Sequence, residues 1–123
     1  MTIREAIDRA DRMRPNAHEW KDKVAWLTAV ERLVADFMNR HENTNIPKPV
    51  YREDTDENTE LLLDFEDAEI YTQWLMMKYE LHNGDFDAYN NMAMAYNDTM
   101  RAWEAEYRRV HRPRRSESGW NAV

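Results

Sequence analysis

The chain of 123 residues has the length of one domain, and its composition excludes several classes of protein. It has no cysteine, so it can form no disulfide, thiolate metal site or cysteine nucleophile. No apolar run approaches the roughly 20 residues that cross a bilayer. The N-terminal segment is charged from Arg4 onward and lacks the apolar stretch of a signal peptide. Two glycines and four prolines favour helices with few connections over a turn-rich β-sandwich.

The formal net charge of −7 is distributed unevenly along the chain. Residues 1–52 carry ten basic and eight acidic side chains, and residues 53–100 carry one basic and thirteen acidic ones. Residues 101–123 carry six arginines and three acids. Such a basic–acidic–basic order is informative about partners more than about fold.

A first helix is predicted to start at Thr2, because Glu5 follows at the spacing of a capping box. Apolar residues then recur at helical intervals up to Met13. Pro15 ends this helix, since its ring disfavours α geometry at Arg14.

A second, longer helix is predicted to start at Asn16 as N-cap, with Glu19 at the N3 position, and to run to about His41. Its apolar stripe consists of Trp20, Val24, Leu27, Val30 or Glu31, Val34 and Met38, widened by Leu33 and Phe37.

Residues 43–60 interrupt the helical pattern. Pro47 and Pro49 exclude a continuous helix, and Val50-Tyr51 could extend into a short edge strand at most. The run from Glu53 to Glu69 holds nine acids and no base. We expect a long acidic loop here, and long loops in compact chains are usually functional or disordered.

One motif in this loop resembles the opening of an EF-hand calcium loop, Asp54-x-Asp56-x-Asn58. The sixth position is Thr59 where glycine is needed, and the twelfth is Phe65 where a bidentate glutamate is needed. We therefore interpret the segment as a solvated turn that leads into a helix.

Two further helices are predicted. The third starts near Asp64 and stops at Asn83-Gly84, where Gly84 fits a C′ position. The fourth has Asp85 as N-cap and runs to about His111. The apolar residues of the third helix are Ile70, Trp74, Met77 and Leu81 on one face and Tyr71, Leu75 and Tyr79 on the next; those of the fourth are Phe86, Tyr89, Ala93, Tyr96, Met100, Trp103, Tyr107 and Val110. So wide an apolar arc on the third helix predicts that it is central to a bundle or covered by another subunit.

The sequence contains no residue pattern typical of catalysis or metal binding. No Glu-x-x-His pair occurs, which a di-metal site in a helical bundle needs. The only serines are Ser116 and Ser118, and the only glycines, Gly84 and Gly119, cannot form a phosphate-binding loop. We expect no catalytic residue, no metal ligand and no cofactor, and we expect that the protein is not an enzyme.

Arginines are concentrated near the C-terminus. They are Arg108, Arg109, Arg112, Arg114 and Arg115, with Trp120 beyond them. The preferred interpretation is docking on an acidic protein surface, because Arg and Trp dominate interface hot spots. A solubilising helix end, where cations interact favourably with the helix dipole, comes second. Contact with nucleic-acid phosphates comes third, since a molecule of net charge −7 approaches DNA poorly.

Several stretches together resemble a family of small proteins encoded among the head genes of tailed phages and prophages of Firmicutes, by their order and spacing over most of residues 3–113. The stretches are Ile3-Arg4-Glu5-Ala6-Ile7-Asp8-Arg9, Asp11-Arg12-Met13-Arg14-Pro15-Asn16, Lys23-x-x-Trp26-Leu27, His41-Glu42, Asp54-Thr55-Asp56-x-Asn58-Thr59-Glu60-Leu61-Leu62, Ile70-Tyr71, Asn83-Gly84, Tyr89-Asn90-Asn91, Met94-x-x-Asn97 and His111-x-Pro113. The chain departs from these relatives after Leu62, where they often carry a proline-containing turn, and in residues 114–123.

The resemblance implies a head–tail connector protein, also called an adaptor or head-completion protein. Such a protein is a small all-α bundle of about four helices, here with a long acidic loop between the second and third helices. It forms a homo-oligomeric ring, a dodecamer in the family, under the portal protein, extends the DNA channel, and docks the next neck, stopper or tail-completion component. The implied location is the neck of the virion, after synthesis in the cytoplasm of the host bacterium, with no membrane contact.

Two groups of residues are assigned on this basis, within a helical domain of residues 1–113 and an extended C-terminal arm of residues 114–123. The arm with the end of the last helix would dock on the portal or on a neighbouring subunit through Arg108, Arg109, Arg112, Arg114, Arg115 and Trp120. The acidic loop would face the channel through Glu53, Asp54, Asp56, Glu57 and Glu60, and would repel passing DNA without binding it.

Two other classes of function fit the sequence. An acidic helical protein of this size could mimic DNA and inhibit a nucleic-acid-binding protein, although its acids cluster in a loop instead of along helical faces. A small helix-turn-helix regulator could use the short turn at Arg14-Pro15-Asn16, although the outer face of the second helix is mixed in charge.

Overall fold

The protein is an all-α bundle in the computed structural model, which describes residues 1–111. This part contains four α-helices and one short 3₁₀-helix. They are α1 (Ile3–Met13), α2 (Trp20–Glu42), η1 (Phe65–Asp67), α3 (Ala68–Asn83) and α4 (Phe86–Val110). The segment around Val50 and Tyr51 forms no strand. None of the helices in residues 1–111 is long and apolar enough to cross a membrane.

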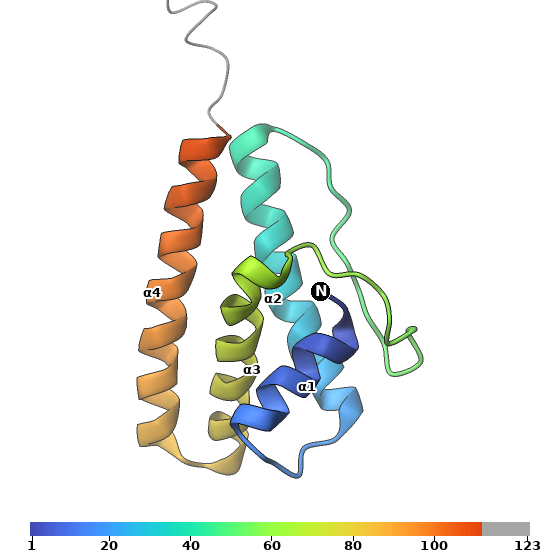
Figure 1. Cartoon of the computed structure of the whole chain (residues 1–123), viewed down its shortest axis with the longest axis vertical. Coiled ribbons are helices and arrows are strands. Elements are labelled where there is room, and N and C mark those ends of the chain that lie inside the picture. Colours follow the sequence, from blue (N-terminus) through green and yellow to red (C-terminus); the bar gives the residue numbers. More distant parts are fainter. Residues whose placement is uncertain (112–123) are drawn as a thin grey trace, which may run out of the picture.

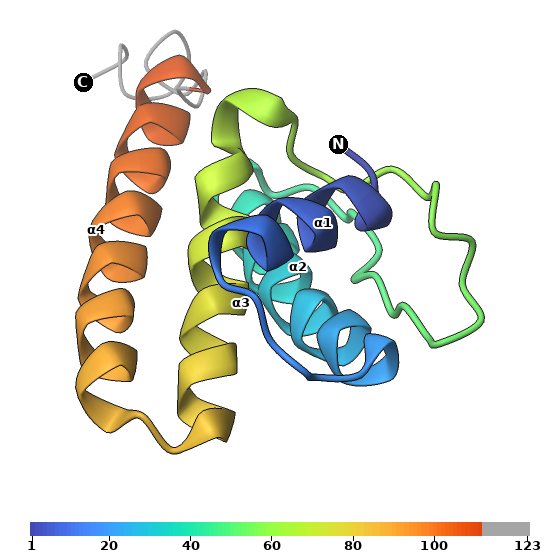
Figure 2. The same cartoon turned by 60° about the horizontal axis from the view of Figure 1, so that its bottom comes forward.

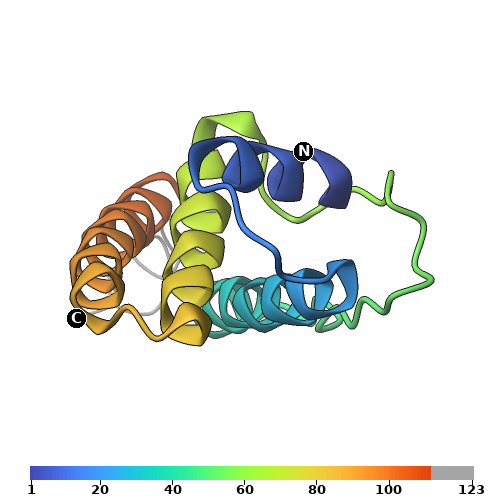
Figure 3. The same cartoon turned by 90° about the horizontal axis from the view of Figure 1, so that it is seen from below.

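The third helix, α3, is the centre of the bundle. It packs against α1, α2 and α4, whereas α1 and α2 have little contact with each other. Figure 3 shows α3 between α4 on one side and the α1–α2 pair on the other. The wide apolar arc predicted for α3 is therefore explained by its central place in the bundle, with Tyr71, Leu75 and Tyr79 fully buried.

The core is formed by one contiguous cluster of apolar side chains from all four helices and the end of the loop. Its members are Met1, Ile3, Ala6, Ile7, Ala10, Val24, Leu27, Val30, Val34, Phe37, Leu61, Leu63, Ala68, Ile70, Tyr71, Leu75, Met76, Tyr79, Tyr96, Met100, Trp103 and Tyr107.

Three predicted helix ends are confirmed, because their signals are local. The Thr2 hydroxyl accepts from the Glu5 amide, and the Glu5 carboxylate accepts from the Thr2 amide, as in a capping box. Gly84 ends α3 with φ 78°, a conformation that favours glycine. The Asp85 carboxylate accepts from the Ala88 amide at the start of α4.

The predicted start of α2 is wrong by three residues. The helix begins at Trp20, and its N-cap Glu19 makes no side-chain capping bond. Asn16 instead stabilises the turn between α1 and α2: its side-chain oxygen accepts from the His18 amide, and its side-chain nitrogen donates to Asp11. The cap-like residue is used in a turn because Asp11 lies within reach.

Four predicted apolar positions face solvent. Met13 at the end of α1 is 58% exposed, and Leu33 on α2 is 45% exposed. Phe86 and Val110 on α4 are 63% and 59% exposed. Both α4 residues lie in its terminal turns, outside the stretch from Tyr96 to Tyr107 that holds all of its buried side chains. Helical periodicity predicts a face correctly, but it does not reveal where the neighbouring helix stops covering it.

A charged residue lies at the centre of the core. Glu31 on α2 is fully buried, and its carboxylate accepts hydrogen bonds from the Tyr51 hydroxyl (2.9 Å), the Leu62 amide (3.0 Å) and the Tyr71 hydroxyl. The Tyr71 hydroxyl also accepts from the Leu63 amide at 2.9 Å. The network therefore attaches both ends of the irregular loop segment 51–63 to α2 and α3.

Glu31→Ala should lower the free energy of unfolding by about 3 kcal/mol or more, because three donors lose a buried acceptor and each unpaired donor costs ~1–3 kcal/mol. Urea unfolding followed by circular dichroism measures this. Tyr89→Phe is a matched control, since its hydroxyl makes no hydrogen bond within residues 1–111, and it should change the value by less than about 0.5 kcal/mol. If the Glu31→Ala variant had the same free energy of unfolding as the control, the stabilising role of this network would be contradicted.

Candidate functional site

The acidic loop lies along the side of the bundle away from α4 and returns past the N-terminus of α1 (Figure 1; Figure 2). Its backbone accepts hydrogen bonds from the first turn of α1: Ile3 donates to the Thr59 carbonyl (3.1 Å) and Arg4 to the Glu57 carbonyl (2.9 Å). The Leu61 amide donates to the Met1 carbonyl at 2.8 Å. Amides at a helix start have no partner within the helix, so the loop supplies acceptors for two of them.

The five acids predicted to face a channel divide into two groups. Glu57 pairs with Arg4, and Glu60 lies 3.0 Å from the amino group of Met1. Glu53, Asp54 and Asp56 are exposed, and within residues 1–111 they form no ion pair. Two of the five acids therefore attach the loop to α1, and three present negative charge to solvent.

The calcium-like motif is used as a turn. One Asp56 carboxylate oxygen accepts from the Asn58 amide at 2.9 Å, and the Thr55 hydroxyl accepts from the Arg52 amide at 2.7 Å. Within the described part of the chain, no group of three or more His, Asp or Glu side chains is arranged to hold a metal ion.

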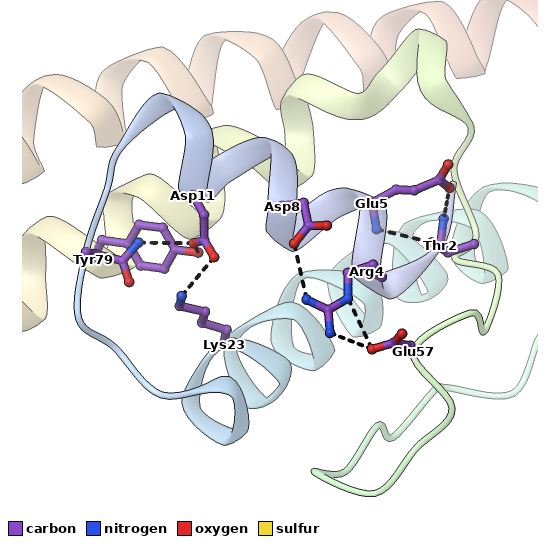
Figure 4. A network of polar contacts seen from close by, with 9 residues as sticks. Thr2, Arg4, Glu5, Asp8, Asp11, Lys23, Glu57 and Tyr79 are labelled. Carbon is purple, nitrogen blue, oxygen red and sulfur yellow. Dashed lines mark hydrogen bonds and ion pairs between the residues drawn. The ribbon is translucent and has the colours of Figure 1, made fainter.

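The loop is bound at the N-terminal end of α1, and a polar network holds the C-terminal end of the same helix (Figure 4). Asp11 accepts from the Lys23 ammonium (2.9 Å) on α2 and from the Tyr79 hydroxyl (2.8 Å) on α3. Lys23 is 7% exposed but the Asp11 side chain is 34% exposed, so this ion pair is partly shielded from water. The guanidinium of Arg4 also lies over the Trp20 ring, 4.5 Å from its centroid, which joins the start of α1 to the start of α2.

Burial alone would raise the pKa of Asp11, but the hydrogen bonds from Lys23, Asn16 and Tyr79 outweigh it and hold this pKa below its ordinary value. Glu31 behaves in the opposite way. Its burial raises its pKa above the ordinary value, although the hydrogen bonds from Tyr71 and Leu62 oppose the shift.

The C-terminal ends of α2 and α4 meet at one end of the bundle (Figure 1). His41 Nε2 lies 2.7 Å from the His111 carbonyl oxygen, and the Tyr107 hydroxyl donates to the Glu42 carboxylate. Phe37 lies at the centre of the aromatic rings that join the two helices. Its neighbours are His41, at 6.1 Å between ring centroids, Trp103, at 5.3 Å, and Tyr107, at 5.7 Å.

This end of the bundle is basic. A hollow of about 420 Å³ is lined by Arg40, His41 and Arg108 together with Phe37 and Glu104. We call these three basic residues the basic end. The Arg108 guanidinium lies 5.0 Å from the centroid of the Phe37 ring, so this residue combines a packing contact with an exposed charge.

The structure brings two of the predicted docking residues to this end, at the last turn of α4. Arg108 lines the hollow, and Arg109 pairs with Glu106 on the same helix, whose pKa it lowers. Arg112, Arg114, Arg115 and Trp120 lie outside the described residues.

Sequence reasoning missed the contribution of α2 to this end and the role of Glu31. The Arg40-His41 pair in the last turn of a predicted helix was a visible signal, since cations are favoured there. For Glu31 the signal was its place in an apolar stripe, next to Val30.

Comparison with protein-family models, with curated proteins and with solved structures gave no significant match. A function for this chain therefore has to be argued from its sequence and its geometry.

The opposite pKa shifts of Asp11 and Glu31 predict opposite pH dependences. The raised pKa of Glu31 contributes stability that is fully present below its unfolded value of 4.5 and is lost as the pH rises through the folded pKa. The lowered pKa of Asp11 contributes stability that is present above 3.8 and is lost as the pH falls through the folded pKa.

The measurement is urea unfolding of wild type, Glu31→Gln and Asp11→Asn over a pH series. From neutral pH down to 4.5, the free-energy difference between wild type and Glu31→Gln should shift in favour of wild type. Below pH 3.8, the difference between wild type and Asp11→Asn should shrink. Differences that move in the same direction would contradict the assignment.

Proposed function

We propose that this protein is a head–tail connector of a virus particle, a ring subunit that binds under the portal protein and extends the channel through which DNA passes. The observation that carries the proposal is that one helical bundle holds two separate surfaces of opposite charge. One is the loop with Glu53, Asp54 and Asp56, and the other is the basic end. A structural protein between two partners and a DNA strand needs surfaces of this kind.

The loop suits a channel wall. Its three exposed carboxylates form no ion pair within the described residues, so they repel phosphates instead of attracting them. The loop backbone is held by α1 and by Glu31, so the charge is presented at a fixed place.

The basic end suits docking on the portal. Arg40, His41 and Arg108 surround a hollow with an aromatic floor at Phe37, and the arginine-rich segment continues from this point. Interface hot spots combine arginine and aromatic side chains in this way.

Ring closure needs two different patches on each subunit, because neighbours in a ring meet head to tail. Exposed apolar side chains occur on both sides of α3. Phe86 and Met94 on α4 are 63% and 67% exposed, and Leu33 on α2 and Val50 after it are 45% and 54% exposed. Contacts between these two patches would close a ring, a dodecamer as in the family that the sequence resembles.

Portal binding tests the docking surface. Truncation of the chain after Val110 removes Arg112, Arg114, Arg115 and Trp120. The truncated chain should bind the portal protein of the same virus at least about tenfold more weakly, because three arginines and one tryptophan of hot-spot type are lost. Surface plasmon resonance on immobilised portal measures the affinity. A variant with Glu53→Gln, Asp54→Asn and Asp56→Asn is the control and should bind like wild type. Equal binding by the truncated chain would refute the docking role.

The same triple variant tests the channel surface. Assembled rings that carry it should retain DNA in a mobility-shift assay at low salt, because a layer of negative charge is removed. The matched control is Glu19→Gln, Asp87→Asn and Asp98→Asn, which removes three acids elsewhere and should leave DNA unbound. Equal DNA retention by both variants would show that the loop does not face the channel.

Size-exclusion chromatography with light scattering separates this function from the alternatives. A connector is expected as a monomer that forms a ring only with portal. A DNA mimic is expected as a monomer that binds a basic protein, and a helix-turn-helix regulator as a dimer.

A further inference from the structure

A second hollow lies between the start of α3 and the second half of α4. Its volume is about 460 Å³, and we call it the α3–α4 groove. The residues that carry the argument are Phe65, Glu66, Asp67 and Glu69 on one wall and Trp103 and Glu106 on the other. Phe65 is 57% exposed although it is a large apolar residue. The groove thus exposes the aromatic ring of Phe65, which no other side chain of residues 1–111 fully covers.

The groove carries four carboxylates against one basic side chain, Arg9. Glu66, Asp67 and Glu69 form no ion pair within residues 1–111, and Glu106 pairs with Arg109. Burial raises the pKa of Asp67, and the neighbouring carboxylates of Glu66 and Asp64 raise it further. Three of the four carboxylates therefore have no paired cation within the described residues.

The groove lining also includes Arg9, whose Nε atom is buried and has no hydrogen-bond acceptor in the described part. Because this atom is inaccessible from outside, a ligand in the groove does not reach it. Arg9 is the only basic residue of the lining, so Glu66, Asp67 and Glu69 lack paired cations within residues 1–111, and a peptide with arginine side chains supplies them.

Such a peptide is present in the same chain. Residues 112–123 contain Arg112, Arg114, Arg115 and Trp120, against one acid, Glu117. They follow α4 directly, and His111 lies only about 8 Å along the helix axis beyond Glu106, at 1.5 Å per residue. Twelve residues in an extended conformation span up to about 40 Å, which is ample to return to the groove.

We propose that the α3–α4 groove binds the arginine-rich C-terminal segment, residues 112–123, of the same chain. Arginine side chains lie against Glu66, Asp67 and Glu69, and Trp120 covers Phe65. The basic end favours this arrangement, because Arg40 and Arg108 repel the segment where it leaves α4. Because the segment and the groove belong to one chain, the effective concentration of the segment at the groove is in the millimolar range. In dilute solution the segment of the same chain therefore outcompetes the segment of a second copy.

This inference is independent of the proposed function. If that function holds as well, the free subunit keeps its arm on its own surface, and a partner that binds the arm must first displace it.

The absence of cysteine makes a direct test possible. Asn121→Cys with a nitroxide label on the cysteine places one spin probe beside Trp120 in the full chain. In ¹⁵N-labelled protein, amide signals of residues 65–69 and the indole signal of Trp103 should broaden at least about twofold more than those of the loop tip at 53–56. Equal broadening in both places, or none, overturns the proposal.

A charge variant tests the recognition. Glu66→Gln with Glu69→Gln should at least halve the broadening in the groove, and raising the salt to about 0.5 M should act in the same direction. Glu53→Gln with Asp54→Asn changes the net charge equally and should leave the broadening as in wild type. All four residues are exposed, so the fold is retained, and unchanged chemical shifts in α1 and α2 verify this. If the broadening in the groove is the same in the Glu66→Gln, Glu69→Gln variant as in wild type, the proposal is overturned.

Mixing distinguishes the same chain from a second copy. Protein that carries the spin label but no ¹⁵N is mixed with ¹⁵N-labelled protein that carries no spin label, at about 50 µM each. The groove signals of the ¹⁵N-labelled protein should remain sharp. Broadening in this mixture as strong as in the single sample would show that the occupant is another copy, and it would overturn the intramolecular assignment.

Discussion

The buried carboxylate of Glu31 is the interaction on which the arrangement of the chain between α2 and α3 depends. Removing a carboxylate from water is unfavourable by several kcal/mol, and only well-placed donors offset this. Here the donors come from two places: Tyr51 and Leu62 in the loop, and Tyr71 on α3. Since these donors are 20 to 40 residues away in sequence, the carboxylate can be satisfied only when the loop and α3 are both in place. The network thus links the folding of the loop to that of the core.

The loop needs such an attachment because its own charges act against it. Nine acids without a base between Glu53 and Glu69 repel one another and favour an extended segment. The pairs that Glu57 and Glu60 form with Arg4 and the N-terminal amine are exposed on the acidic side, and exposed pairs contribute only about 0–1 kcal/mol each. Backbone hydrogen bonds to Ile3 and Arg4 and the buried bonds to Glu31 therefore carry most of the attachment.

The features that sequence predicts well are those determined by neighbours along the chain. Thr2, Gly84 and Asp85 end or begin helices as expected, because capping bonds and a left-handed φ involve residues within four positions. Asn16 carries the same local signal as a cap, but Asp11 of the preceding helix competes for its side chain, and the helix starts three residues later than predicted.

The features that depend on distant neighbours could not be predicted. Periodicity places Leu33 and Phe86 on apolar faces, yet whether another helix reaches them is a property of the whole bundle. Likewise, the arginines near residue 108 are visible in the sequence, but their approach to Arg40 and His41 requires α2 and α4 to end side by side. The four carboxylates of the α3–α4 groove come from segments more than 35 residues apart, so the groove has no signature in the sequence.

The positions of the two charge types at this end of the bundle follow from the directions of the helices. In Figure 1, α2 and α4 run upward and end at the top of the molecule, whereas α3 runs in the opposite direction and begins about halfway up. The C-terminus of a helix is stabilised by cations and its N-terminus by anions. Arg40, Arg108 and Arg109 lie in last turns, and Glu69 lies in the first turn of α3, with Glu66 and Asp67 just before it. Alternating helix directions thus stabilise a basic surface and an acidic groove close together, and of their charged groups only Arg109 and Glu106 form an ion pair within residues 1–111. An arginine-rich segment that leaves α4 at this point is repelled by the basic end and attracted by the acidic α3–α4 groove. The charges of the fold therefore favour a path of the segment toward the groove.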